Sequence, residues 1–317
     1  MMDTMGNVYR NMGLYSQAQS LLERAVESRR RVMGPEHPDT LRSMDALAVV
    51  FRRQSRFGDA EKLHRETLEI LKRTLGPDRI ETLRSTNNLA RVLTEEGRFP
   101  EAAKLLSEAL ERSRRVLGPD HEVTLQSAIY LAQAFSSQGR TNDAEKLFRE
   151  VVAGRRRVLG PEHPDTLTAM SDLALNSMSQ KHYAEAGNLY RETLETERRI
   201  LGPEHPDTII GMGGLGWSYM EQRRYREAES VFRETLRLSL KVFGQHNAYT
   251  AETIYNLACL AALQGKREDA FAALRQALDH GYRRADEMPN DEDLKSLHGD
   301  RRFNAILADL KKLTAAR

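Results

Sequence analysis

The chain contains 317 residues, of which 40% are hydrophobic and 30% are charged, and its 48 basic and 46 acidic side chains leave a formal net charge of only +2. A balance this even provides no bulk attraction to nucleic acid or to an acidic membrane surface. The single cysteine, Cys259, excludes an internal disulfide and fits a reducing compartment, and no apolar run is long enough to span a membrane, so we expect a cytoplasmic protein without a membrane partner.

A Gly recurs every 42 residues and marks the linkers of a repeat. The six glycines of this series are Gly34, Gly76, Gly118, Gly160, Gly202 and Gly244. The sequence PEHPDT that follows Gly34 returns unchanged after Gly160 and Gly202. Self-similarity at a period of this size indicates stacked structural repeats, each of which contacts mainly its neighbours.

Each 42-residue unit is predicted to form two helices, as its second copy illustrates. The first helix is expected to begin at Asp39 or Thr40, whose side-chain oxygens can cap it. Its apolar residues on one face are Met44, Leu47, Ala48 and Phe51. The pattern stops at Ser55, where other units hold the glycine of a left-handed helix end. A second helix then runs to Gly76, because Pro77 prevents its continuation.

Small residues recur at two positions of every unit and are interpreted as core. The first series is Ala18, Ala60, Ala102, Ala144, Ala186, Ala228 and Ala270. The second series is Gly6, Ala48, Ala90, Ala132, Ala174, Gly216 and Ala258. A small residue at a helix crossing lets two backbones approach closely. The glycine-rich segment 211–216 lies inside a predicted helix, so we interpret it as close packing and not as a phosphate loop.

This order of Leu, small residue and aromatic residue in one helix, followed by Ala and a Leu pair in the next, resembles the tetratricopeptide repeat. The 42-residue spacing and the LGPEHPDT linker resemble the long form found in kinesin light chains and many bacterial repeat proteins. The resemblance covers residues 2 to about 280. It implies an all-α fold, a right-handed superhelical solenoid of seven antiparallel helix hairpins over residues 1–280. The first hairpin lacks a preceding linker, from which we expect a truncated hairpin cut from a longer array.

Residues 281–317 leave the register and are predicted to form a C-terminal capping segment. Pro289, Asn290 and Asp291 indicate a turn into a helix that continues through Leu297. The last predicted helix carries an apolar stripe formed by Phe303, Ile306, Leu307 and Leu310. We expect this stripe to cover the open end of the seventh hairpin, as terminal caps of repeat arrays do.

No pattern in the sequence is typical of catalysis, a cofactor or a metal. His37, His121, His163 and His205 each occupy the same place in a linker. Neighbouring units lie about 10 Å apart, too far for two of these rings to share a metal with bonds of about 2 Å. We interpret them as loop packing or capping, and we predict no enzymatic activity, no catalytic residue, no cofactor and no metal site.

The face beside the apolar stripe of each first helix is the predicted binding surface, because the resemblance implies that first helices line a concave groove. The predicted peptide-binding residues are Arg42, Arg52, Arg84, Asn87, Arg91, Met178, Trp217, Met220 and Tyr255. The arginines are expected to contact acidic groups and Asn87 to bond the partner's backbone. Trp217, with the methionines and the tyrosine, is expected to form an exposed apolar patch of the kind that marks partner sites.

The predicted function is a non-enzymatic scaffold that holds a peptide segment of a partner protein in its groove. One alternative is a regulatory repeat region cut from a larger signalling enzyme of kinase or protease-like type. Nucleic-acid binding is a third reading, prompted by basic runs such as Arg29–Arg31 and Arg155–Arg157. Their place in the last turn of the second helix already explains them, since cations there complement the helix dipole.

Overall fold

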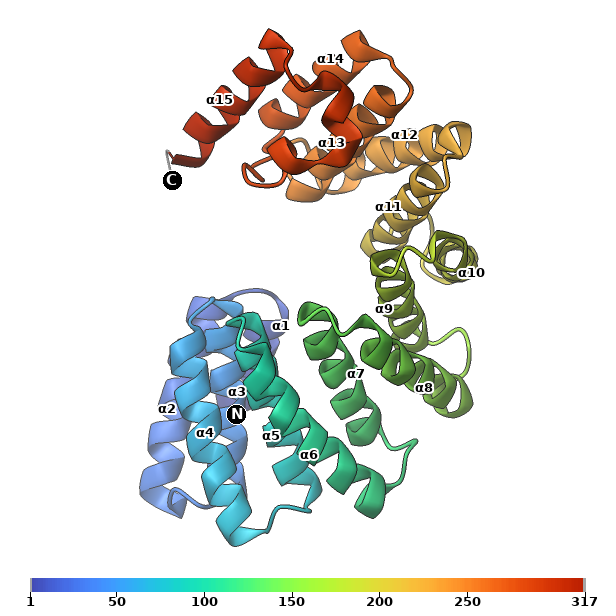
Figure 1. The fold of residues 1–317 in the computed structure, drawn as a ribbon. Helices are drawn as coiled ribbons and strands as arrows, with labels where there is room; N and C mark the ends of the chain where they lie inside the picture. Colours follow the sequence, from blue (N-terminus) through green and yellow to red (C-terminus); the bar gives the residue numbers. More distant parts are fainter. Residues whose placement is uncertain (1, 316–317) are drawn as a thin grey trace. The chain divides into compact units, whose positions relative to one another are not determined.

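The computed structural model describes residues 2–315 and consists of helices joined by short turns, with no β-strand in this range. Consecutive helices pack as pairs, so the predicted all-α repeat architecture is confirmed (Figure 1). Within residues 2–315, none of the helices combines the length and the apolar character that a membrane crossing requires.

The chain divides into two compact units at residue 169. The first unit contains α1 (Met2–Asn11), α2 (Tyr15–Met33), α3 (Pro38–Arg53), α4 (Phe57–Thr74), α5 (Ile80–Glu95), α6 (Phe99–Leu117), α7 (Glu122–Ser137) and α8 (Thr141–Leu159). Helix α9 (Pro164–Ser179) contains the boundary. The second unit continues with α10 (Tyr183–Ile200), α11 (Pro206–Glu221), α12 (Tyr225–Val242), α13 (Ala248–Leu263), α14 (Arg267–Asp279), the 3₁₀ helices η1 (Met288–Asn290) and η2 (Glu292–Leu297), and α15 (Arg301–Ala315).

Two polar contacts close five of the six linkers; the linker after Gly76 has only the second, because Arg79 replaces the histidine and makes no side-chain cap. The His37 ring accepts a hydrogen bond from the Asp39 amide at its Nδ1 atom (3.2 Å), and the Thr40 hydroxyl donates to the Gly34 carbonyl oxygen (2.8 Å). The same pair of contacts recurs at His121 and Thr124, His163 and Thr166, His205 and Thr208, and Asn247 and Thr250. The predicted capping role of the histidines is therefore confirmed. The expected N-cap at Asp39 or Thr40 is wrong, because the His37 ring supplies the acceptor and Pro38 begins the helix.

The turn inside each hairpin contains one residue in the left-handed region. Gly97 and Gly139 occupy it with φ of 78° and 74°, as predicted from the sequence. The equivalent residue of three other hairpins is Ser55, Lys181 or Arg223, with φ of 60°, 63° and 59°. A side chain in this conformation costs roughly 1–2 kcal/mol, because its Cβ approaches the following carbonyl oxygen.

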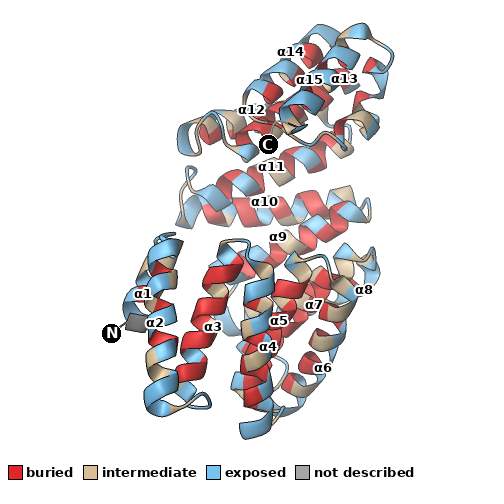
Figure 2. Ribbon diagram, turned by 90° about the vertical axis from the view of Figure 1, so that its left-hand side faces the viewer, coloured by how far each residue is buried: buried red, intermediate tan, exposed pale blue. Residues whose placement is uncertain are grey.

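The recurring small residues lie where helices cross, as predicted. Most of α3 is buried, whereas α2 keeps exposed residues along one side (Figure 2). In the glycine-rich segment, a Cβ added to Gly214 would lie 2.6 Å from the ring of Tyr190, and one added to Gly216 would lie 2.7 Å from the ring of Phe232. Both glycines therefore make room for an aromatic ring of a neighbouring helix.

The C-terminal segment covers the last hairpin of the second unit. Helix η2 packs on α13, and α15 packs on α14 with Phe303, Ile306 and Leu310 buried. The segment expected to be a helix through Leu297 is a short 3₁₀ helix, whose N-cap is Asp291. The expected division between repeats and cap, at residues 280 and 281, falls in the turn after α14.

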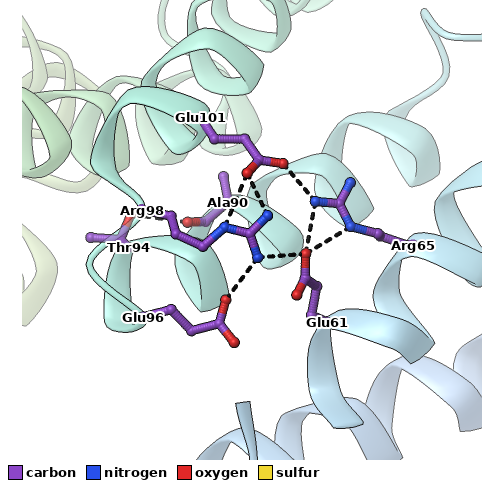
Figure 3. Close-up of polar contacts among 7 residues, drawn as sticks. All are labelled: Glu61, Arg65, Ala90, Thr94, Glu96, Arg98 and Glu101. Atoms are coloured by element: carbon purple, nitrogen blue, oxygen red, sulfur yellow. Dashed lines mark hydrogen bonds and ion pairs between the residues drawn. The ribbon is translucent and has the colours of Figure 1, made fainter. Parts of the chain in front are cut away.

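Ion pairs join neighbouring hairpins along the second helices. Arg98, in the turn before α6, contacts Glu61 of α4 at 2.8 Å and Glu101 of its own helix at 2.5 Å, and Arg65 joins the same two carboxylates (Figure 3). The basic runs also form ion pairs, since Arg30 and Arg114 contact Glu66 and Glu150 of the next hairpin, and Arg157 contacts Asp120 in the linker before its own hairpin. These guanidinium groups serve the packing of the repeats.

Candidate functional site

A basic hollow of about 550 Å³ opens on the first unit, between α1, α3 and α5. Its lining is formed by Arg10, Asn11, Tyr15, Val49, Arg52, Arg53, His64, Asn88 and Arg91. Four guanidinium groups from three helices therefore converge on one concavity. Two of them, Arg52 and Arg91, belong to the predicted groove residues.

One carboxylate holds two of these arginines in place. Glu95 accepts from Arg52 at 2.6 Å and from Arg91 at 3.3 Å, and Arg91 also donates to the Tyr130 hydroxyl at 3.1 Å. Burial lowers the pKa of Arg52, and the positive charges of Arg91 and Arg53 lower it further. Arg53 is exposed, and among residues 4–315 no carboxylate forms an ion pair with it. The hollow therefore carries more positive charge than its own carboxylates neutralise.

A buried histidine beside a partly exposed carboxylate adjoins the hollow. The His64 ring, almost fully buried, places Nδ1 3.2 Å from Asp45 Oδ1, which also accepts from the Asn88 amide at 2.9 Å. Burial raises the pKa of Asp45, but the nearby His64 ring and the hydrogen bond from Asn88 outweigh this effect, so the pKa of this carboxyl lies below its ordinary value. Asp45 is therefore engaged by His64 and Asn88 of its own unit, and it does not neutralise the exposed Arg53.

The remaining predicted residues of the first unit lie outside the hollow. Arg42 and Arg84 are exposed near the starts of α3 and α5, and they pair with Asp39 and Glu122 respectively. Asn87 is buried, donates to the Val123 carbonyl oxygen at 3.4 Å and accepts from the Ser127 hydroxyl at 2.9 Å. The prediction that Asn87 bonds a partner's backbone is wrong, because its amide is enclosed between α5 and α7.

In the second unit, only one of the four predicted residues is exposed. Trp217 is 38% exposed and donates from Nε1 to Glu221 Oε1 at 3.2 Å. Met178, Met220 and Tyr255 are each less than 7% exposed. The predicted exposed patch of Trp, Met and Tyr is therefore wrong for these three residues. The reason is that neighbouring hairpins bury not only the apolar stripe of a first helix but also the residues on either side of this stripe.

The exposed column of the first helices is narrower than expected, and the repeat register identifies it. Val49, Arg91, Leu175 and Trp217 share one register position, and Arg53, Glu95 and Glu221 share the position one turn later. Arg10, Arg53 and Glu221 are not among the predicted peptide-binding residues. Counting in steps of 42 from Trp217 and from Arg53 would have found the two columns.

Three potential metal ligands meet where the C-terminal segment covers α13. Ligand atoms of Cys259, Asp291 and Asp293 lie within 4.8 Å of one another. Burial raises the pKa of the Cys259 thiol well above its usual value, which disfavours the thiolate that a metal needs. Asp291 instead caps η2 through the Asp293 amide and accepts from the Tyr255 hydroxyl at 2.6 Å. This arrangement fastens the segment to α13.

A second hollow, of about 640 Å³, lies between α6, α7 and α8. Its walls are mainly apolar and include Leu110, Leu131 and Phe135. Arg140 at its rim pairs with Asp143 and lies 3.8 Å from the centre of the Phe135 ring. Because this charge is already satisfied, the smaller basic hollow is the better candidate for a binding site.

Comparison with known proteins places this geometry in context. The sequence matches the tetratricopeptide repeat family over residues 1–73, 47–112, 81–157, 174–241 and 218–280. The search of curated proteins gave no match.

Solved structures with a similar fold include kinesin light chain-like repeat proteins. One is a putative kinesin light chain from Podosopora anserina with nearly identical repeats, 27% identical with a TM-score of 0.59, where the match covers 65% of this chain and 97% of that chain. BtubC from P. vanneervenii is 20% identical with a TM-score of 0.63, covering 74% and 94%. A signal transduction ATPase from Pyrococcus horikoshii with a tetratricopeptide repeat sensor is 15% identical with a TM-score of 0.66, covering 99% and 44%.

Proposed function

The chain belongs to the tetratricopeptide repeat family, and from this premise we propose that it is a non-enzymatic scaffold that holds a peptide segment of a partner protein against its first helices. The observation that carries the proposal is the basic hollow of the first unit. Its four arginines converge on one concavity, and Arg53 has no carboxylate partner among residues 4–315. An unneutralised concave surface of this kind is suited to an acidic segment.

The chemistry of arginine supports recognition of carboxylates in the hollow. A guanidinium group is planar and presents several donors, so that it binds a carboxylate through two parallel hydrogen bonds. Glu95 already orients Arg52 and Arg91. Less side-chain freedom is therefore lost when a segment binds, which favours affinity. Arg42 and Arg84 extend the basic surface toward the starts of α3 and α5, and Trp217 offers an apolar contact on the second unit.

The proposal is tested by selecting 12-residue peptides from a random displayed library against the purified chain. We expect enrichment of Asp and Glu among the peptides bound by the native protein. A fluorescein-labelled copy of the consensus peptide is then titrated with Arg53→Gln and with Arg24→Gln. Arg24 is an exposed arginine on α2 away from the hollow, and it has no ion-pair partner among the described residues.

Loss of about tenfold in affinity is expected for Arg53→Gln, which corresponds to roughly 1.4 kcal/mol. Arg24→Gln should bind as the native protein does, because it lies outside the hollow. The affinity should also fall as salt is added, since charge pairs dominate the contact. Equal affinities for the two variants, or a library without acidic enrichment, would contradict the proposed role of the hollow.

A further inference from the structure

The exposed side of α11 carries an apolar column. Ile210 and Trp217 are 51% and 38% exposed, and their separation of seven residues puts them on the same side of the helix. Leu175, which is 52% exposed, occupies on α9 the register position that Trp217 occupies on α11. Large apolar side chains that stay exposed on a first helix indicate a surface for a partner.

Carboxylates border this column. Trp217 donates to Glu221, and the negative charge of Glu221 also acts on Asp293 of the covering segment. Burial, together with the negative charges of Asp291, Glu221 and Glu292, raises the pKa of Asp293 to about 6. No lysine or arginine within residues 2–315 forms an ion pair with Glu221, Asp291 or Asp293. What this group of acids lacks is a positive charge.

The acids are held in fixed positions. Asp291 accepts from the Tyr255 hydroxyl and from the Asp293 backbone amide, and the ring of Tyr255 stacks on Tyr282 with centroids 4.3 Å apart. Glu221 lies one turn after Trp217 and is hydrogen-bonded to the indole. A cation that enters therefore meets an arrangement that needs little reordering, next to an indole ring whose face attracts cations.

We propose that Ile210, Trp217 and Leu175, with the carboxylates of Glu221, Asp291 and Asp293, form a docking surface for a basic peptide segment that presents an apolar side chain next to a lysine or arginine. The inference rests on the proposed scaffold function and gives it a second, opposite charge preference. The apolar side chain packs on Trp217, and the ammonium or guanidinium group lies between the indole and the acids. The first unit takes acidic groups and the second takes basic ones.

The test uses Trp217 itself, because it is the only tryptophan of the chain. Two 12-residue peptides with the same alternating pattern are compared, one of Leu and Lys and one of Leu and Glu. We expect the Leu–Lys peptide to change the Trp217 emission saturably and the Leu–Glu peptide to leave it unchanged. Glu221→Gln and Asp293→Asn should each raise the Kd of the Leu–Lys peptide about tenfold, whereas Glu195→Gln, an exposed acid on α10, should not.

Three results would overturn the inference. The first is equal binding of the Leu–Glu peptide to this surface, and the second is a Leu–Lys affinity that neither Glu221→Gln nor Asp293→Asn changes in variants with native circular dichroism. The third is a change of Trp217 emission by Zn²⁺ alone that a chelator reverses, since the acids would then serve a metal. The inference and the proposed function can be distinguished. If an acidic peptide binds in an Arg53-dependent way but no Leu–Lys peptide binds at Trp217, this inference is wrong and the scaffold proposal stands.

Discussion

A carboxyl group of the second unit should make its stability depend on pH in an unusual direction. Glu197 on α10 is only 5% exposed, and its Oε2 atom has no hydrogen-bond partner among the described residues. Burial, with a contribution from the charge of Asp207, raises the pKa of Glu197 from 4.5 to about 7. The folded state therefore holds a proton between these values that the unfolded chain releases.

The sign and size follow from linkage. Because the folded pKa is raised, the free energy of unfolding increases as the pH falls from about 7 to about 4.5, and the ionised group destabilises the fold above about pH 7. A difference of this size corresponds to about 3 kcal/mol. Glu197→Gln mimics the protonated form, so it should be more stable than the native chain at about pH 8, by up to about 3 kcal/mol, and similar to it at about pH 5.

Urea unfolding followed by the emission of Trp217 measures this difference, because Trp217 and Glu197 lie in the same unit. Glu195→Gln, two residues away and exposed on the same helix, controls for the loss of a charge and should keep the native pH dependence. Asp293, whose pKa is raised to about 6, also makes the free energy of unfolding fall as the pH rises. This smaller effect is present in the native chain and in both variants. An unchanged slope in Glu197→Gln, or a loss of stability at about pH 8, would refute the reasoning.

The repeat itself explains why Glu197 is anomalous. Its register position holds Arg29 and Arg155 in two other hairpins, where the guanidinium donates to the carbonyl oxygens of Asp39 (2.7 Å) and Asp165 (2.5 Å). An ionised glutamate cannot donate such a bond, whereas a protonated one can. Glu197→Arg should therefore restore the contact seen in the other hairpins and remove the pH dependence as Glu197→Gln does.

Substitutions that address three features of the repeat, the hairpin turn, the helix crossing and the linker, test its packing by urea unfolding. Ser55→Gly should stabilise the first unit by roughly 1 kcal/mol, because residue 55 has a positive φ, and Gly97→Ser should destabilise it by a similar amount. Gly216→Ala should cost about 1–3 kcal/mol through its clash with Phe232, and Phe232→Leu in the same chain should recover part of the loss. Thr166→Val should cost about 1–3 kcal/mol, because the Gly160 carbonyl oxygen loses its donor; no loss would show that water replaces the hydroxyl.

The sequence predicted the helices and turns well because the 42-residue register repeats the same physical constraint many times. Gly97 and Gly139 each indicate a left-handed turn in their own hairpin. The 42-residue spacing then locates the same turn at Ser55, where no glycine indicates it. The capping role of the linker histidines was predicted, but the N-cap itself was expected at Asp39 or Thr40 and lies at His37. A ring nitrogen in this role is less familiar than an Asp or Thr oxygen.

The binding residues were harder to predict, because burial around a first helix is set by two neighbouring hairpins. Asn87 and Tyr255 share a register position with Asp45, yet both are buried while Asp45 is partly exposed. The difference comes from what the next hairpin, or η2 in the case of Tyr255, places over that position. A helical wheel drawn for one helix contains no information about these covering groups.

The repeat contains positions that pack the helices together and positions that face solvent, and the two kinds affect different properties of the protein. Positions that stay small in every unit, such as those equivalent to Ala48, hold the helices at one distance, and a larger side chain there would disturb the fold. The neighbouring column of half-exposed and exposed residues reads Val49, Arg91, Gln133, Leu175 and Trp217, so its side chains differ in size and charge from unit to unit. Because the fold does not constrain this column, its charge and shape are available for recognition. The change from guanidinium groups around Arg53 to carboxylates around Glu221, at one register position of the same repeat, is therefore where differences in partner preference within this chain are expected to arise.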